Sequence, residues 1–175
     1  SVTTTLNGGY GSRTVVGGAG FLMNNEMDDF SAKPGVPNMY GALGGEANAI
    51  APGKRMLSSM TPTLVLKGDD PYVVIGTPGG TTIPTSVFQG IVNIIDFGMN
   101  ADDAVNKPKF HHQWFPDEVD IEKDFNPETT RRLQEMGYKI SVRGSIGRTE
   151  AIRILPNGRR ETIADKRGDD SVAGY

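Results

Sequence analysis

The stretch Pro71–Phe97 reads PYVVIGTPGGTTIPTSVFQGIVNIIDF and joins a strand, a glycine turn and a helix. Its first part is rich in β-branched residues, which is typical of a buried strand. Its last part places apolar residues along one wide face of a helix, which Thr81 or Thr82 is expected to cap. The adjacent glycines Gly79 and Gly80 stand between the two. They can form a phosphate cradle, an oxyanion hole, or a tight turn without chemistry.

The turn itself weakens one of these three hypotheses. No Lys-Ser or Lys-Thr pair follows the glycines, and their spacing is not that of a dinucleotide-binding fingerprint. The backbone N–H groups at a helix N-terminus still favour a negative charge, such as a carboxylate or the oxyanion of an acyl-transfer intermediate. The motif alone therefore leaves the oxyanion hole and the plain turn open.

The elements around this stretch predict an α+β fold, with helices packed on a mostly antiparallel sheet. Gly68–Pro71 separates two β-branched runs and indicates a hairpin. Downstream, Asn126 and Pro127 begin a helix that Gly137 ends. Further strands are expected at Glu118–Glu122 and in the runs KISVR, TEAIRIL and RRETIAD, and a short helix is expected in NADDAVN.

The N-terminal third predicts strands followed by a long loop. Val2–Leu6 is rich in β-branched residues, and Arg13–Val16 and Gly20–Asn25 are further strand candidates. Glu26–Arg55 has no clean period, and a loop of this length inside a compact domain is usually functional, such as a lid. At this length the whole chain, residues 1–175, is expected to form a single domain.

Composition excludes several function classes. The formal net charge of -3 argues against nucleic-acid binding. No apolar run reaches the length of a membrane span. The chain has no cysteine, which excludes thiol catalysis, disulfides and cysteine-based metal sites. We expect no cofactor and no metal.

Two groups of polar residues are candidates for ligand recognition. Glu26 and Asp29 lack the spacing of a calcium loop, but two carboxylates suit an ammonium group. Ser58 and Ser59 are potential donors to an anion. Each group also has a plainer interpretation, since acidic residues often lie in a solvated loop and serines often bond the local backbone.

Thr5 and Asn7 point to the same face of the expected first strand, so they can serve one site together. His111 and His112 are adjacent, and no third ligand stands at a recognisable metal spacing. We favour a structural role for both histidines. No Ser-His-Asp arrangement and no nucleophile is evident, so the residues offer recognition and stabilisation only.

Four blocks of this sequence together resemble the small subunit of gamma-glutamyltransferase, also called gamma-glutamyl transpeptidase. They are NNEMDDFSAKPGVPNMYG, ANAIAPGKRMLSSMTPTLVLK, TPGGTT and FHHQWFPDE, and the resemblance runs from TTTLN to the C-terminal AGY. The family implies an N-terminal nucleophile hydrolase, an αββα sandwich of two stacked sheets that a large subunit completes. It also implies a precursor that cleaves itself before a threonine, which becomes the nucleophile and, through its amine, the base.

The resemblance assigns roles to individual residues. Thr5 would bond the hydroxyl of the nucleophile, and Gly79 and Gly80 would form the oxyanion hole. The glutamyl group would be held by Asn7, Glu26 and Asp29 at its α-amino group, by Ser58 and Ser59 at its α-carboxylate, and by a lid that carries Tyr40. The family's nucleophile would lie one hairpin's length before Ser1, so no residue of this chain is assigned that role.

The implied reaction moves the γ-glutamyl group of glutathione or a related compound to water, an amino acid or a peptide. The implied location is periplasmic or secreted. Glu26 stands where many bacterial relatives carry Gln, and Thr81-Thr82 replaces the Ser-Arg of several relatives. Two alternatives stay open. One is a related acylase for glutaryl or cephalosporin side chains, whose substrates lack the α-amino group that Asp29 would bind. The other is a non-catalytic domain that binds an amino acid.

Overall fold

The computed structural model describes residues 2–174, which form two compact units. The N-terminal unit comprises residues 2–59 and the C-terminal unit residues 60–174, and each is described by itself. Within the described residues, every helix is too short or too polar to cross a membrane. The expectation that residues 1–175 act as one domain stays a prediction.

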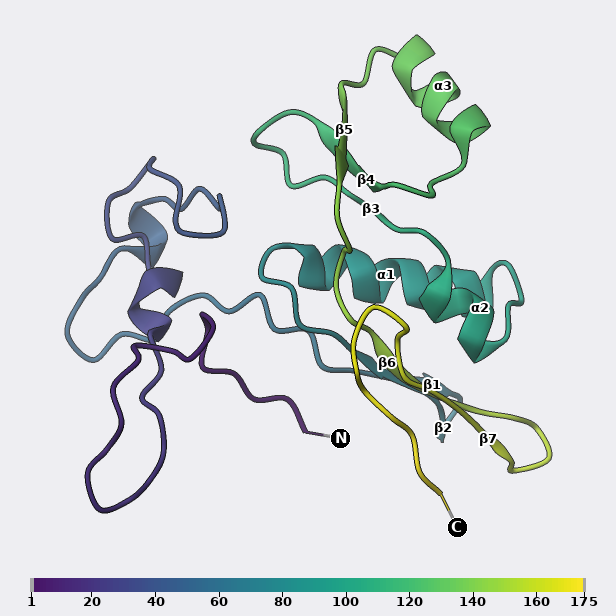
Figure 1. Ribbon diagram of the computed structural model, residues 1–175, viewed down its shortest axis with the longest axis horizontal. Helices are drawn as coiled ribbons and strands as arrows, with labels where there is room; N and C mark the ends of the chain where they lie inside the picture. The colour runs from purple at the N-terminus through teal and green to yellow at the C-terminus, as the bar shows by residue number, and fades with distance from the viewer. Residues whose placement is uncertain (1, 175) are drawn as a thin grey trace. The chain divides into compact units, whose positions relative to one another are not determined.

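The C-terminal unit contains a four-stranded antiparallel sheet in the order β1-β2-β6-β7. Its strands are β1 (Thr63–Lys67), β2 (Asp70–Gly76), β6 (Glu150–Ile154) and β7 (Arg160–Ile163). β1 and β2 form the predicted hairpin, in which Lys67 pairs with Asp70. Helices α1 (Thr82–Ile95) and α2 (Ala101–Asn106) pack on one face of this sheet (Figure 1).

A second sheet has three strands in the order β3-β4-β5. They are β3 (Phe110–His111), β4 (Val119–Glu122) and β5 (Ile140–Arg143). β3 and β4 are antiparallel, whereas β4 and β5 are parallel, because helix α3 (Pro127–Glu135) supplies the crossover that a parallel pair needs. The predicted cap of α3 is confirmed, since the Asn126 side chain accepts a hydrogen bond from the Thr129 N–H at 2.9 Å.

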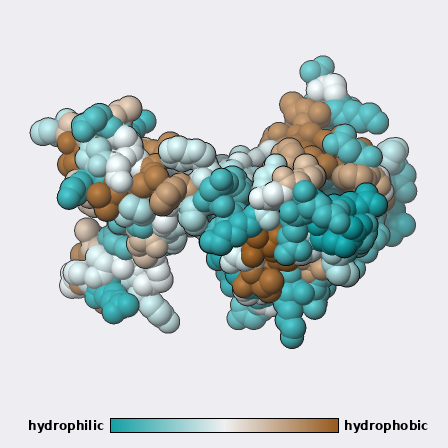
Figure 2. Space-filling model, turned by 90° about the horizontal axis from the view of Figure 1, so that it is seen from above, coloured by the Kyte–Doolittle hydropathy of each residue, from teal (hydrophilic) through white to brown (hydrophobic). Residues whose placement is uncertain are grey.

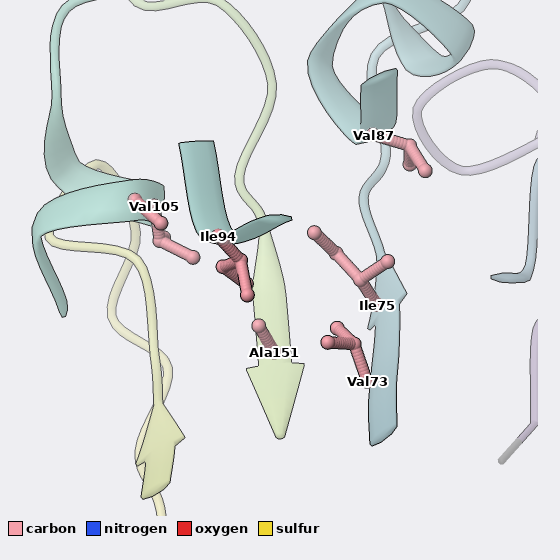
Figure 3. Packing of buried hydrophobic residues seen from close by; sticks show 7 residues of the cluster. Val73, Ile75, Val87, Ile94, Val105 and Ala151 are labelled. Carbon is pink, nitrogen blue, oxygen red and sulfur yellow. The ribbon is translucent and has the colours of Figure 1, made fainter. Parts of the chain in front are cut away.

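The hydrophobic core lies between the two helices and the four-stranded sheet (Figure 3). It consists of buried residues from β2, α1, α2 and β6: Val73, Ile75, Val87, Ile94, Ala104, Val105 and Ala151. α1 approaches β2 closely at Gly90, where an added Cβ would lie 2.5 Å from Ile75 Cδ1. The glycine in mid-helix therefore serves close packing of the helix on the sheet.

The opposite face of the sheet carries a row of exposed and half-buried side chains. Leu64, Val74, Ile152 and Thr162 are successive cross-strand partners on β1, β2, β6 and β7. Strand alternation turns them away from the face that buries Val73 and Ile75. Leu64 is 56% exposed and Ile152 37% exposed. The sheet thus has one face covered by helices and one apolar face open to another layer.

The N-terminal unit is mostly irregular and contains two 3-10 helices, η1 (Glu26–Asp29) and η2 (Glu46–Asn48). The predicted strand at Val2–Leu6 is wrong, since these residues are exposed and form no ladder with other described residues. The expected strands at Arg13–Val16 and Gly20–Asn25 reduce to one bridge between Val15 and Leu22. β-propensity alone does not make a strand, because the backbone needs a paired neighbour.

Candidate functional site

The turn Thr77–Thr82 connects β2 to α1 with a backbone that favours glycine at two positions. Gly79 has a φ of 144° and Gly80 a φ of 60°. A Cβ on Gly79 would lie 2.3 Å from Thr82 Oγ1. The expected threonine cap is wrong: Thr81 makes no side-chain cap, and the Thr82 hydroxyl donates to the Gly79 carbonyl at 2.9 Å. The Thr82 hydroxyl therefore links the first residue of α1 back to the glycine turn.

The same turn presents backbone donors at the start of α1. Within the described residues, no acceptor receives the N–H groups of Gly79 and Gly80. Their carbonyl groups are engaged, because they accept from the N–H groups of Thr82 and Ile83 at 3.1 and 3.2 Å. Two consecutive donors at the positive end of a helix dipole favour an anion. This geometry is compatible with an oxyanion hole, and it suits the negative oxygen of an acyl-transfer intermediate.

A group of acidic residues lies beside Tyr40 in the N-terminal unit. η1 places Glu26 and Asp29 three residues apart, where side chains of a 3-10 helix align. Burial raises the pKa of Glu26 to about 7, and the hydrogen bond and negative charge of Asp29 add to this effect. Burial also raises the pKa of Tyr40, and the charges of Asp29, Asp28 and Glu26 contribute. A bound cation would relieve the repulsion within this group.

Hydrogen bonds tie this loop to the first residues of the chain. The Tyr40 hydroxyl donates to the Asn7 carbonyl at 2.8 Å, and Asn7 Nδ2 donates to the Asn25 carbonyl at 3.2 Å. Thr5 Oγ1 accepts from the Asn7 N–H at 2.8 Å. Asn7 has a φ of 69°, so a local turn brings Thr5 and Asn7 together. Thr5 and Asn7 are therefore not brought together by the strand alternation that the sequence predicted.

Asn48 connects the acidic group to the serine pair, and sequence reasoning missed it. Asn48 Nδ2 donates to the Asp29 carbonyl at 2.7 Å, while its Oδ1 accepts from the Leu57 N–H at 2.9 Å. The side chain therefore holds the backbone immediately before Ser58 and Ser59 against the end of η1. No sequence signal identifies an asparagine that bridges two backbone segments, since its spacing to both is arbitrary.

The two histidines occupy structural positions. His111 is buried, and its Nδ1 and Nε2 lie 2.8 Å from Thr85 Oγ1 and 2.9 Å from Gln113 Oε1. The half-buried His112 lies 3.2 Å from an Asp117 carboxylate oxygen. Within residues 2–174, no three or more His, Asp or Glu side chains are grouped to hold a metal ion. The structural interpretation of His111 is confirmed, because both ring nitrogens face protein partners.

The structure thus defines two sets of candidate residues, one in each unit. The N-terminal unit holds Thr5, Asn7, Glu26, Asp29, Tyr40, Ser58 and Ser59, linked through backbone and side-chain contacts. The C-terminal unit holds Gly79 and Gly80. The first set suits an ammonium group and a carboxylate, and the second suits an oxyanion.

The comparisons with known proteins agree on one family. The sequence model of the family described as Gamma-glutamyltranspeptidase matches residues 1–175. The glutathione hydrolase proenzyme of Escherichia coli is 50% identical over 176 residues, which cover 100% of this chain and 30% of that protein. The chain therefore spans about 30% of the length of this curated relative.

Solved structures extend the likeness to three dimensions. A mutant of Helicobacter pylori gamma-glutamyltranspeptidase has a TM-score of 0.92 at 50% identity, over 95% of this chain and 92% of that chain. A cephalosporin acylase from Bacillus halodurans has a TM-score of 0.83 at 30% identity, over 95% of this chain and 30% of that chain. The backbone is thus shared by proteins named for different acyl substrates, and the side chains of the site must distinguish them.

Proposed function

The chain belongs to the gamma-glutamyltranspeptidase family, and from this premise we propose that it is the small subunit of a glutathione hydrolase and γ-glutamyltransferase. The observation that carries the proposal is the half-buried carboxylate pair Glu26 and Asp29 beside Tyr40. A γ-glutamyl group carries a free α-ammonium, which is the cation that such a pair suits. The substrates are glutathione and related γ-glutamyl compounds, and the acceptors are water, amino acids and peptides.

The reacting group is the γ-carbonyl carbon. A threonine that the family places before Ser1 attacks this carbon, and its proton passes through its own amine to the leaving nitrogen. The N–H groups of Gly79 and Gly80 stabilise the negative oxygen of the tetrahedral intermediate, at about 3 kcal/mol for each donor. Thr5 bonds the threonine hydroxyl before the attack. The amine departs and leaves an acyl-enzyme, in which the threonine oxygen is the ester oxygen. Water or an acceptor amine then attacks the ester and releases the threonine.

Recognition of the donor falls to the N-terminal unit. Asn7, Glu26 and Asp29 bind the α-ammonium, and Ser58 and Ser59 donate to the α-carboxylate. The loop that carries Tyr40 covers the bound group, which the Tyr40–Asn7 hydrogen bond supports. Two charged ends are therefore fixed at a distance from the reacting carbonyl, and this orients the carbonyl for attack.

The partner in this proposal is the large subunit of the same precursor. The row Leu64, Val74, Ile152 and Thr162 supports it, because a sheet face of this kind is stable when a second sheet packs against it. Packing a sheet against this row would contribute about 25 cal/mol for each Å² of apolar surface buried. Another face of the molecule, which Figure 2 shows from above, carries hydrophobic patches among hydrophilic ones.

Maturation and location complete the proposal. The precursor cleaves itself before the catalytic threonine, which agrees with the description of the Escherichia coli relative as a proenzyme of greater length than this chain. The mature protein is periplasmic or secreted, as the resemblance implies. A cofactor has no role in this chemistry, because the threonine, its amine and the two glycine N–H groups supply the nucleophile, the base and the oxyanion donors.

An acylase for glutaryl or cephalosporin side chains is the second candidate, and the likeness to the Bacillus halodurans acylase favours it. A glutaryl group has no α-amino group, so it would leave the carboxylates of Glu26 and Asp29 without a cation. Leaving a charge unpaired in a closed pocket is costly. The chemistry of the acidic group therefore supports the γ-glutamyl substrate.

The test compares hydrolysis of a γ-glutamyl anilide and a glutaryl anilide by the intact, processed parent protein. We expect kcat/KM to favour the γ-glutamyl compound by roughly 10³-fold or more, since sites built around a polar group reject analogues that lack it. A preference for the glutaryl compound would contradict the proposal. Binding of glutamate without turnover of either anilide would instead support a non-catalytic binding domain.

Substitution of Glu26 by Gln is expected to change the pH dependence of donor binding. Below about pH 7 the protonated Glu26 no longer attracts the α-ammonium, so KM of the parent enzyme should rise as the pH falls. Between pH 8 and pH 6, kcat/KM should fall by up to about tenfold. The pH dependence of kcat/KM reports the pKa values of the free enzyme. In Glu26→Gln this contribution should disappear. Dividing kcat/KM by kcat gives 1/KM, which isolates the effect on KM. If 1/KM depends on pH in the same way in the wild type and in Glu26→Gln, the prediction is refuted.

Substitution of Asn48 by Ala is expected to raise KM for the γ-glutamyl donor by about tenfold, through loss of two hydrogen bonds of about 1 kcal/mol each. The bonds hold the segment before Ser58, so kcat at saturation should change little. Asn126→Ala is a matched control in the other unit, where the side chain accepts from the Thr129 N–H at the start of α3. Steady-state kinetics check both, and a fall in kcat alone for Asn48→Ala would show that the bridge acts elsewhere.

A further inference from the structure

A buried ion cluster of Lys109, Glu122, Asp165 and Arg167 lies in the C-terminal unit. The exposed fractions of the four side chains are 10% or less. Arg167 donates from Nε and Nη2 to the two Glu122 oxygens, at 2.6 Å each, and from Nη1 to Asp165 Oδ1 at 2.9 Å. Lys109 Nζ lies 3.1 Å from Asp165 Oδ2. Two positive and two negative charges therefore balance within the cluster.

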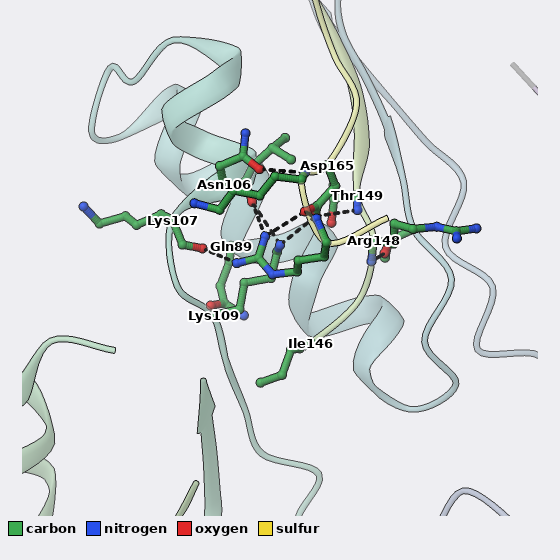
Figure 4. Close-up of polar contacts among 12 residues, drawn as sticks. Gln89, Asn106, Lys107, Lys109, Ile146, Arg148, Thr149 and Asp165 are labelled. Atoms are coloured by element: carbon green, nitrogen blue, oxygen red, sulfur yellow. Dashed lines mark hydrogen bonds and ion pairs between the residues drawn. The ribbon is translucent and has the colours of Figure 1, made fainter. Parts of the chain in front are cut away.

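The carboxylates of this cluster also hold a short segment of backbone. Glu122 Oε1 accepts from the Ile146 N–H at 2.8 Å. Asp165 Oδ2 accepts from the Thr149 N–H at 2.8 Å (Figure 4). Burial acts to raise the pKa of Glu122, but hydrogen bonds from Arg167 and from the Ile146 and Lys109 N–H groups outweigh it and lower the pKa. Glu122 is thus an ionised acceptor, and residues 146–149 are clamped at both ends.

The clamped segment contacts the glycine turn before α1. The Arg148 N–H donates to Thr77 Oγ1 at 2.8 Å, and the Thr77 hydroxyl donates to the Pro78 carbonyl at 2.8 Å. Gly147 has a φ of 66°, and an added Cβ there would lie 2.8 Å from Thr77 Oγ1 and 3.0 Å from Ser86 Oγ. Its Cα lies 3.5 Å from the position that a Cβ of Gly79 would take. The segment therefore packs directly behind the turn.

We propose that the ion cluster positions the N–H groups of Gly79 and Gly80 through residues 146–149. The proposal rests on the proposed function, in which these groups receive the oxyanion. An apolar cluster of similar volume often gives equal or better stability than buried charges, so fold stability alone does not explain four of them. Charged carboxylates instead hold backbone N–H groups at fixed distances, and an oxyanion hole depends on donors fixed in advance. The four residues are positioning residues, since they reach the reacting atoms only through other groups.

The test uses the full-length precursor and measures the processed enzyme with a γ-glutamyl anilide. Glu122→Gln removes the charge of the clamp, and Thr77→Val removes the acceptor of the Arg148 N–H with little change of shape. Each should lower kcat by about tenfold, a fraction of the effect of losing one oxyanion donor. KM for the anilide should stay unchanged, because its γ-carbonyl is neutral in the ground state and the oxyanion forms only in the transition state. The double variant should lose less than the product of the single losses.

Ile94→Ala is the matched control, since Ile94 is a buried core residue of α1 outside the cluster and the turn. It should lower Tm and leave kcat unchanged. Unchanged kcat in Thr77→Val at wild-type Tm would overturn the proposal, even if Glu122→Gln fails to fold. The proposal would also be overturned if the loss of kcat in the double variant equalled the product of the two single losses, or if the single variants changed only KM. Failure of the wild-type enzyme to hydrolyse the γ-glutamyl anilide would contradict the proposed function instead.

Discussion

Substitution of Gly79 by Ala in the assembled enzyme is expected to lower kcat by about 10²–10³-fold, the cost of losing one oxyanion donor. The φ of 144° at Gly79 is outside the range that alanine adopts readily. The new Cβ would also meet Thr82 Oγ1 at 2.3 Å, so the turn must change shape and turn its N–H groups away. KM should change little, because the negative oxygen exists only in the transition state.

Gly158→Ala is the control for backbone strain. Gly158 has a φ of 78° and open space around its Cβ position, so the variant carries a similar conformational penalty in the β6–β7 turn. We expect a lower Tm in both variants and a loss of kcat only in Gly79→Ala. A kcat for Gly79→Ala within about threefold of the wild type would remove the oxyanion role from this glycine, since oxyanion donors have larger effects.

Substitution of Asp29 by Asn is expected to lower kcat/KM for a γ-glutamyl anilide by about 10²–10³-fold. Truncating one partner of a charge pair at a buried site costs about 2–5 kcal/mol, and each 1.4 kcal/mol is tenfold. The loss should fall mainly on KM, since the α-ammonium is bound in the ground state as well as in the transition state. Hydrolysis of a glutaryl anilide should not fall, because that substrate offers no ammonium to Asp29.

Asp28→Asn is the matched control for this change of charge. Asp28 adjoins Asp29 and accepts from the Met39 N–H through Oδ2 at 3.2 Å, a bond that an asparagine oxygen can also accept. The kcat/KM of Asp28→Asn should stay within about threefold of the wild type, because the variant keeps the bond to the Met39 N–H and removes only a charge that the proposed ammonium contact does not use. Equal losses in both variants would mean that the overall negative charge of η1, and not a specific contact of Asp29, attracts the donor.

Local sequence signals predicted the elements that are stabilised locally. The β1–β2 hairpin, the α1 helix and the Asn126 cap of α3 are confirmed, because turn residues, helical periodicity and capping act within a few positions. The expected α+β fold of N-terminal nucleophile hydrolase type is confirmed by the solved gamma-glutamyltranspeptidases. The strand at Val2–Leu6 was wrong, since its β-propensity meets no partner strand among residues 2–174.

The site was less accessible to sequence reasoning than the fold. Glu26, Asp29, Gly79 and Gly80 stand in compact blocks and could be recognised as groups. Asn48 could not, because a side chain that bridges backbone segments leaves no periodic pattern. The ion cluster was equally hidden, since its members come from three separate segments and their charges look ordinary along the chain. Contacts between distant positions need a structure.

The crystal structure of the assembled enzyme with glutamate bound tests the central claim most directly. The account predicts the α-ammonium within hydrogen-bond distance of Asp29 and Glu26, and the α-carboxylate within reach of Ser58 and Ser59. One oxygen of the γ-carboxylate should accept from the N–H groups of Gly79 and Gly80. Glutamate bound with its γ-carboxylate away from these glycines, or with its ammonium away from Asp29, would contradict the account.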